Sequence, residues 1–179
     1  WNRMGVKLFL VGYMGCGKSS LGRKLAKVTG FEFVDMDSVI EQREGATISD
    51  IFNYAGEEYF RRAERALIEE LATSEQNTII STGGGAPTWK DNMDFMNSAG
   101  ECIYLRRTAE QIASRLSPHG RQKRPKLRGL NDEELVAFMT KNMAEREPYY
   151  SQAKCIGECA ERSDAEIIDI ILSYVKSYE

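Results

Sequence analysis

One short stretch limits the possible folds of this chain more than any other: FLVGYMGCGKSSLG, residues 9–22. It contains the pattern G-x-x-x-x-G-K-S, made by Gly12, Gly17, Lys18 and Ser19. The apolar run before it, VKLFLV, is typical of a strand that is buried on both faces of a parallel sheet. The run after it, SSLGRKLAKVT, has the apolar spacing of a helix. A strand, this turn and a helix in that order predict an α/β fold in which the turn (the P-loop, residues 12–19) binds phosphate.

The residue types in the P-loop indicate a nucleoside triphosphate as its ligand. Glycines allow backbone N–H groups to point inward, and the N-terminus of the following helix adds partial positive charge. Lys18 is expected to reach the β- and γ-phosphates, and the Ser19 hydroxyl to ligate Mg²⁺. The expected nucleotide-binding residues here are Gly12, Gly15, Cys16, Gly17, Lys18, Ser19 and Ser20. A glycine turn that binds nothing is the alternative, and the flanking strand and helix disfavour it.

The rest of the chain alternates apolar runs with segments of helical spacing. Further strands are expected near residues 31–34, 78–82, 102–105 and, more weakly, 154–159. A length of 179 residues suits one domain with its own core. The alternation therefore predicts a single domain, residues 1–179, in which a five-stranded parallel sheet is flanked by helices on both faces.

Composition and charge narrow the class of protein. A net charge of −3 and a pI of about 5.4 do not favour nucleic acid as a partner. The four cysteines form no C-x-x-C pair and the chain has one histidine, so no zinc site is expected, and reduced thiols indicate the cytoplasm. No apolar run approaches the ~20 residues that span a bilayer, and no signal peptide is visible. We expect a cytoplasmic monomer without membrane or nucleic-acid partners.

Three further features point to a small anionic acceptor for the phosphate, rather than water. In DMD, Asp35 and Asp37 follow a strand, so that one carboxylate could hold the magnesium shell and the other a substrate hydroxyl. In FRRAE, an arginine could grip a carboxylate with two bonds. In TGGGAP, three glycines leave the backbone open to a ligand. The alternatives are, in the same order, a helix N-cap, surface ion pairs and a flexible turn.

These segments, with RPKL and EREPYY and in this order, resemble the shikimate kinase family. The resemblance covers about residues 4–153, and the combination of DxD, FRxxE and GGG is specific, whereas many nucleotide enzymes share the P-loop. It implies a nucleoside-monophosphate-kinase-like P-loop fold with a lid. It also implies transfer of a phosphoryl group from ATP to the 3-hydroxyl of shikimate, a step in chorismate and aromatic amino-acid biosynthesis.

The resemblance further implies roles for single residues on the acceptor side. Asp35 would organise Mg²⁺ through water, with Ser19 as a direct ligand, and Asp37 would bind the shikimate hydroxyls. Arg61, supported by Glu64, would grip the shikimate carboxylate. The remaining pocket residues would be Gly83, Gly84 and Gly85, which line it, and Arg146, the second carboxylate ligand.

The basic, breaker-rich segment 117–130 predicts a mobile loop and corresponds to the family's lid. Its Arg124 would reach the transferring phosphates, and Arg115, just before it, would lie along the adenine. Lys18, Asp37 and Arg124 are therefore the expected catalytic residues. The lid departs from the common RPLL, and the segment CIGECAERSDAEI departs from the family pattern, so no adenine contacts are assigned there.

Two alternatives lie outside this interpretation. The first is another small-molecule kinase of the same fold, such as a gluconate or nucleoside-monophosphate kinase, which the combined motifs disfavour. The second is a regulatory module that binds ATP and transfers nothing, although Lys18, Asp37 and Arg124 are all present. Release of ADP in the presence of different hydroxy acids would separate these readings.

Overall fold

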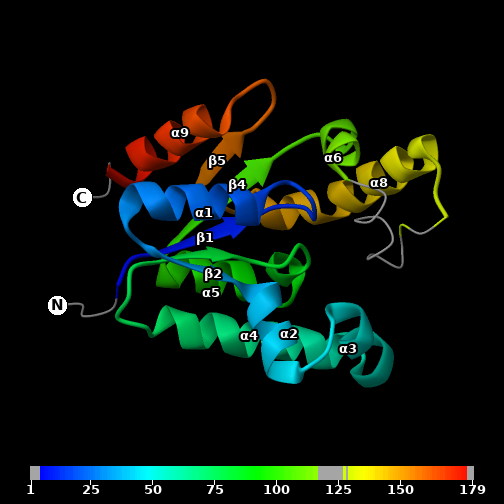
Figure 1. Cartoon of the computed structure of the whole chain (residues 1–179), viewed down its shortest axis with the longest axis horizontal. Coiled ribbons are helices and arrows are strands. Elements are labelled where there is room, and N and C mark those ends of the chain that lie inside the picture. The colour runs from blue at the N-terminus through cyan, green and yellow to red at the C-terminus, as the bar shows by residue number, and fades with distance from the viewer. Residues whose placement is uncertain (1–4, 117–126, 128, 177–179) are drawn as a thin grey trace.

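A five-stranded sheet forms the centre of the molecule (Figure 1). The computed structural model describes residues 5–116, 127 and 129–176. The strand order is β2-β3-β1-β4-β5, and each neighbouring pair of strands is parallel. The strands are β1 (Lys7–Val11), β2 (Glu32–Asp35), β3 (Thr78–Ser81), β4 (Glu101–Arg106) and β5 (Cys155–Glu158). The predicted parallel sheet is confirmed, including its weakly indicated fifth strand.

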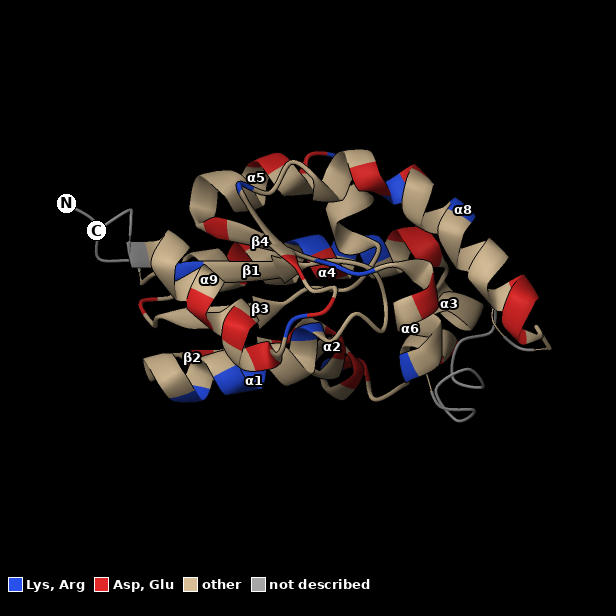
Figure 2. Cartoon of the chain, turned by 90° about the horizontal axis from the view of Figure 1, so that it is seen from above, with Lys and Arg blue, Asp and Glu red and all other residues tan. Residues whose placement is uncertain are grey.

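Helices cover both faces of the sheet, with α1 and α9 on one face and α5 and α8 on the other (Figure 2). The helices are α1 (Lys18–Thr29), α2 (Met36–Glu44), α3 (Ile48–Ala55), α4 (Glu57–Ala72), α5 (Asn92–Ala99), α6 (Ala109–Arg115), α8 (Asp132–Tyr150) and α9 (Asp164–Lys176), and a short 3-10 helix is η1 (Ala86–Thr88). Within the described part of the chain, no helix is both long and apolar enough to cross a bilayer.

The core explains why the strands lie where they do. All five residues of β1 are buried, because this strand occupies the middle of the sheet and helices cover both of its faces. Leu8, Ile80 and Ile103 on three adjacent strands are at most 1% exposed, and burial of each such side chain contributes about 1.5–3 kcal/mol. The pairings Leu10↔Ser81 and Val11↔Tyr104 align the carboxyl ends of β1, β3 and β4. The loops after these strands therefore meet at one edge of the sheet.

Several helix boundaries are set by capping residues in the local sequence. The Thr47 hydroxyl accepts a hydrogen bond from the Asp50 N–H at the start of α3, and Gly56 separates α3 from α4. Thr108 opens α6 with a reciprocal capping box. The Ser163 hydroxyl accepts from the Glu166 N–H at the start of α9.

One helix and one buried leucine were not anticipated. α2 begins directly after β2, as the N-cap alternative for the DMD segment implies, whereas the unanticipated α5 lies between the glycine turn and β4. In the predicted lid, Leu127 is 1% exposed and belongs to the core. Residues 117–126 and 128 of this segment lie outside the described part of the chain. They include the predicted catalytic residue Arg124.

Candidate active site

The P-loop connects β1 to α1 and forms one half of the site. Gly17 is the N-cap of α1 and has a φ of 95°, a left-handed conformation that favours glycine. The first turn of α1 contains no acidic residue. The partial positive charge of its N–H groups and of the helix dipole is therefore not neutralised within that turn. This geometry suits an anion at the mouth of the loop.

Lys18 lies inside the P-loop. Its side chain is 8% exposed, and Nζ donates to the carbonyl oxygens of Gly12 at 2.8 Å and Tyr13 at 3.0 Å. The ammonium group is therefore held against the loop by neutral acceptors, without a carboxylate among these partners. Because these partners are neutral, the ammonium group can pair with a phosphate ligand.

Three side-chain oxygens from different elements gather beside the P-loop. Ser19 Oγ donates to Asp35 Oδ2 at 2.9 Å and lies 3.1 Å from Ser81 Oγ. Hydroxyl and carboxylate oxygens are the ligand types that Mg²⁺ prefers, and this ion usually takes its other ligands from water and phosphate. Among the described residues, no three or more His, Cys, Asp or Glu side chains are arranged so that they could hold a metal ion, so a cation here would need such outside ligands. Ser81 was not singled out from the sequence.

Asp35 also fulfils the alternative interpretation of the DMD segment. Its Oδ1 accepts hydrogen bonds from the N–H groups of Asp37 at 3.1 Å and Ser38 at 3.4 Å, and so caps α2. One oxygen of Asp35 therefore orients the helix while the other faces Ser19. The cap places Asp37 in the first turn of α2, at the same edge of the sheet.

The carboxylates of Asp37 and Glu64 meet at the glycine turn after β3. A Cβ atom placed on Gly83 would lie 2.5 Å from Glu64 Oε2 and 3.1 Å from Asp37 Oδ1. Glu64 is fully buried, and its Oε2 has no hydrogen-bond partner among the described residues. Burial raises the pKa of Asp37, with a further contribution from the charge of Asp35. Burial also raises the pKa of Glu64 to about 7. This pocket can accept a hydroxyl proton or hydrogen bond at two carboxyl groups.

Arg61 extends from α4 toward the same turn. Its Nη1 donates to Glu64 Oε1 at 2.6 Å, and the two side chains are 11% and 0% exposed. Its guanidinium lies over the rings of Phe52 and Phe60, 5.9 and 5.4 Å from their centroids. A Cβ atom on Gly85 would collide with the Arg61 guanidinium. The neighbouring Arg62 and Arg65 form the ion pairs that were the alternative for this segment, whereas Arg61 lies against the glycine turn at Gly85.

Arg146 reaches the same glycine turn from α8. Its Nη1 lies 3.3 Å from the position of a Cβ on Gly84, and its guanidinium lies 5.5 Å from the Tyr13 ring centroid. Tyr150, four residues later on α8, donates from its hydroxyl to the Gly84 carbonyl oxygen. Tyr13 donates to Asn142 Oδ1 at 2.8 Å. These bonds tie α8 both to the glycine turn and to the P-loop, and the sequence did not reveal them.

The structure therefore brings the predicted residues together at one edge of the sheet, with Arg124 outside its described part. The Arg115 Nη2 lies 2.9 Å from the position of a Cβ on Gly17, next to the P-loop. Of the other predicted P-loop contacts, Cys16 is buried and Ser20 is exposed. The backbone N–H of Cys16 donates to Tyr13 O at 3.2 Å.

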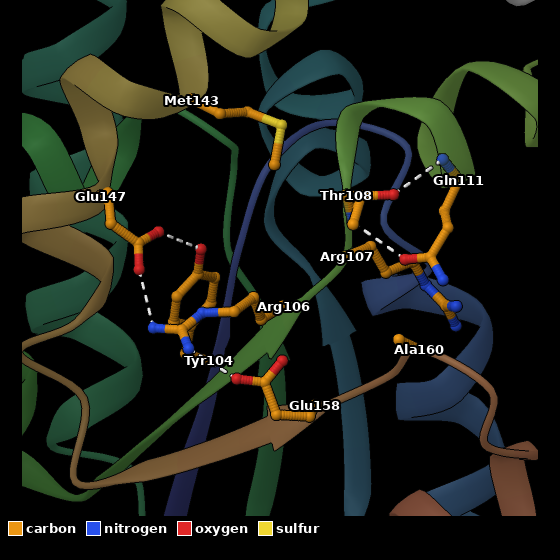
Figure 3. A pocket seen from close by; sticks show the side chains of 9 residues that line it. All are labelled: Tyr104, Arg106, Arg107, Thr108, Gln111, Met143, Glu147, Glu158 and Ala160. Atoms are coloured by element: carbon orange, nitrogen blue, oxygen red, sulfur yellow. Dashed lines mark hydrogen bonds and ion pairs between the residues drawn. The ribbon is translucent and has the colours of Figure 1, made fainter.

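A cavity of about 250 Å³ lies beside this site, at the end of β4 (Figure 3). Three of its polar side chains bond to one another or to Glu158: Tyr104 donates to Glu147 at 2.5 Å, and Arg106 bridges Glu147 at 2.7 Å and Glu158 at 2.5 Å. The Nε of Arg106 is buried and has no hydrogen-bond partner among the described residues. The lining residues are Tyr104, Arg106, Arg107, Thr108, Gln111, Met143, Glu147, Glu158 and Ala160. This group was not anticipated from the sequence.

Comparison with known proteins decides the family. The model of the shikimate kinase family matches residues 14–176. The chain belongs to the shikimate kinase family. It is 46% identical to the shikimate kinase of Parabacteroides distasonis over 147 residues, which are 82% of this chain and 84% of that protein. It is 41% identical to the shikimate kinase of Bacteroides thetaiotaomicron over 159 residues, or 89% of this chain and 90% of that protein.

Solved structures of the family agree with the fold. A crystal structure of shikimate kinase from Bacteroides thetaiotaomicron matches with a TM-score of 0.87 and 36% identity, covering 96% of this chain and 98% of that one. Shikimate kinase from Acinetobacter baumannii in complex with shikimate matches with a TM-score of 0.84 and 32% identity, covering 99% and 96%. A gluconokinase from Sinorhizobium meliloti has a TM-score of 0.61 at 17% identity over 99% and 95% of the chains, which shows the shared fold alone.

Proposed function

We infer that this enzyme transfers the terminal phosphoryl group of ATP to the 3-hydroxyl of shikimate. The observation that carries the inference is the acceptor site, where Arg61 from α4 and Arg146 from α8 approach a glycine turn that carries no side chains. Two guanidinium groups suit a carboxylate, and the carboxyl groups of Asp37 and Glu64 beside them suit hydroxyls. A hydroxylated carboxylic acid such as shikimate presents both kinds of group.

We propose that the protein acts chiefly by positioning and by charge stabilisation. The P-loop backbone and Lys18 hold the phosphates, while Arg61 and Arg146 orient the acceptor. Asp37 holds the reacting hydroxyl, either as base or as orienter, since a loose transition state needs little proton removal in advance. The catalytic role of Arg124 and the lid role of residues 117–130 stay predictions.

The arrangement of Ser19, Asp35 and Ser81 fits Mg²⁺, because Ser19 Oγ lies 2.9 Å from Asp35 Oδ2 and 3.1 Å from Ser81 Oγ. We propose that Ser19 binds the ion directly and Asp35 through water. When bound, Mg²⁺ neutralises charge on the phosphates. We also propose a cytoplasmic location, because all four thiols are free and buried, as in a reducing compartment. The monomeric state stays a prediction.

A coupled assay of ADP release tests the function. Shikimate, gluconate and a nucleoside monophosphate are offered separately with ATP and Mg²⁺. We expect rapid ADP release with shikimate and release near background with the other two. Preference for gluconate or the nucleotide would support another kinase of the same fold. Tight ATP binding with no acceptor-dependent release would support a regulatory module.

A further inference from the structure

Two consecutive arginines at the end of β4 differ in their partners. Arg106 pairs with Glu147 at 2.7 Å and Glu158 at 2.5 Å, so its charge is compensated. Arg107 forms no ion pair with any described residue, although it is only partly exposed. In Figure 3, Arg107 points away from this group of paired side chains and has no bond to the other residues drawn. Its position therefore needs a different explanation.

The Arg107 side chain lies against the P-loop. Its Nε donates to the carbonyl oxygen of Cys16 at 2.8 Å. Its Nη2 lies 4.0 Å from the position of a Cβ on Gly17, and Nη2 of Arg115 lies 2.9 Å from the same point. Two guanidinium groups from different elements thus converge on the residue that caps α1.

Convergence of these positive groups is unfavourable without a negative partner. Like charges repel at such separations even near a protein surface, and the N-terminus of α1 adds partial positive charge. The first turn of α1 supplies no carboxylate. Lys18 adds a further cation in the same loop, with carbonyl acceptors only among its nitrogen–oxygen contacts. An anion at Gly17 would relieve this repulsion, and the anion that the family brings to this loop is ATP.

We propose that Arg107 is a further nucleotide-binding residue, which braces the Cys16 carbonyl through Nε and contacts the polyphosphate of ATP through its terminal nitrogens. This proposal deepens the proposed function and rests on it for the identity of the nucleotide. The guanidinium fork suits the chemistry, because one N–H can hold the loop while four others stay available to phosphate oxygens. Arg107 lies outside every motif of the sequence analysis, so this contact adds to those that the family resemblance implies.

Calorimetric titration of the whole chain, without acceptor, tests the proposal with two ligands, ATP and inorganic tripolyphosphate. Arg107→Gln keeps a donor for the Cys16 carbonyl but removes the charge. We expect it to weaken binding of both ligands by the same factor, about tenfold or more, as for a lost charged hydrogen bond. Arg107→Lys keeps the charge and loses the fork, so its affinities should fall between those of the wild type and Arg107→Gln.

The other outcomes overturn the proposal. Weaker binding of ATP alone, with tripolyphosphate unchanged, would place Arg107 against the nucleoside. Unchanged binding of both ligands would leave Arg107 as a brace of the loop only. If Arg107→Gln does not fold, Arg107→Lys is used in its place. An equal loss of affinity for ATP and tripolyphosphate in that variant supports the contact, and unchanged affinities refute it.

A control variant and the wild-type reaction complete the test. Arg62→Gln removes one positive charge from an exposed pair on α4 and should leave both affinities unchanged. Shikimate phosphorylation by the wild type is measured separately. If the wild type does not phosphorylate shikimate, the proposed function is refuted, but the tripolyphosphate affinities still report on Arg107. If the Arg107 variants bind both ligands as the wild type does, the contact is refuted, but the wild-type turnover still supports the proposed function.

Discussion

The nucleotide side and the acceptor side of this site are built in different ways. The nucleotide side is largely one continuous stretch of backbone, whose positive-φ Gly17 and helix N-terminus create the phosphate site. The acceptor side consists of charged side chains that come from α2, α4 and α8 and converge on the turn after β3. Backbone dipoles are fixed when the chain folds, whereas buried charges depend on one another.

This difference teaches where each half is vulnerable. On the nucleotide side, the backbone N–H groups remain after most side-chain substitutions, so only a charge that touches phosphate should matter strongly. On the acceptor side, removal of one partner leaves another charge buried without compensation. Arg61 and Glu64 illustrate this, since they are 11% and 0% exposed and 2.6 Å apart. Four substitutions probe the comparison.

The largest effect is expected for Lys18→Ala. The ammonium group is held by two carbonyl oxygens and the Cys16 thiol of its own loop, so its removal should leave the fold intact while the transferring phosphates lose a positive charge. Loss of such stabilisation costs ~10²–10³-fold or more in kcat. Steady-state kinetics, with circular dichroism as a check of folding, measure this. Turnover near that of the wild type in the folded variant would show that the backbone alone carries the nucleotide side.

Gly83→Ala should separate the two halves most cleanly. The added methyl group would lie 2.5 Å from Glu64 Oε2 and 3.1 Å from Asp37 Oδ1, so both carboxyl groups must move. A displacement of this size can reduce kcat by about 10²-fold. ATP affinity, measured by calorimetry, should stay within about twofold, because the P-loop is untouched.

Gly157→Ala on β5 is the matched control for that variant. A Cβ there meets its neighbours at 3.6–3.7 Å, which is ordinary contact, so kcat should be preserved. If Gly83→Ala weakens ATP binding as strongly as it slows turnover, the two halves of the site are not independent.

A smaller and more specific effect is expected for Arg61→Ala. One charge-assisted contact to a carboxylate is worth roughly 1.5–3 kcal/mol, so the KM for shikimate should rise about tenfold or more. The KM for ATP should change little. Arg61→Lys should restore only part of the loss, because an ammonium group lacks the planar fork.

The adjacent Arg62 provides the control for Arg61. It forms an exposed pair with Glu58 at 2.7 Å, and Arg62→Ala should leave both KM values unchanged. Equal effects of Arg61→Ala and Arg62→Ala would point to the general charge of α4 and not to a bound carboxylate.

The same contrast explains what could be predicted from the sequence. The P-loop is contiguous, so its residues and its place between a strand and a helix follow from local pattern alone. Thr108 and Gly56 likewise act on their immediate neighbours, where each sets a helix boundary. The parallel sheet followed from the alternation of elements.

Long-range side-chain contacts were beyond the sequence pattern. The bond from Tyr13 to Asn142 joins residues 129 positions apart, and the bond from Arg107 to Cys16 joins residues 91 positions apart. Neither belongs to a local motif, so no spacing rule indicates them. Asp35 shows a different limit, because its two oxygens serve two purposes at once, and a motif suggests only one at a time.

The smallest expected effect concerns stability and comes from Glu64. This carboxyl group faces Arg61 on its own helix, Asp37 from α2 and Arg146 from α8, and burial raises its pKa from an ordinary 4.5 to about 7. The folded state therefore binds the proton more tightly than the unfolded state does. The stabilisation from this group is complete below about pH 4.5 and is lost as the pH rises through about 7. Thermal unfolding of the wild type and Glu64→Gln between pH 5 and 8.5 measures it. The Tm of the wild type should fall relative to that of Glu64→Gln over this window, because the amide cannot ionise.

The exposed Glu58 is the control, and Glu58→Gln should give a curve of Tm against pH that is parallel to that of the wild type. Parallel curves for Glu64→Gln would mean that Arg61 holds Glu64 ionised throughout, and the acceptor side would then resemble the nucleotide side in carrying fixed charge.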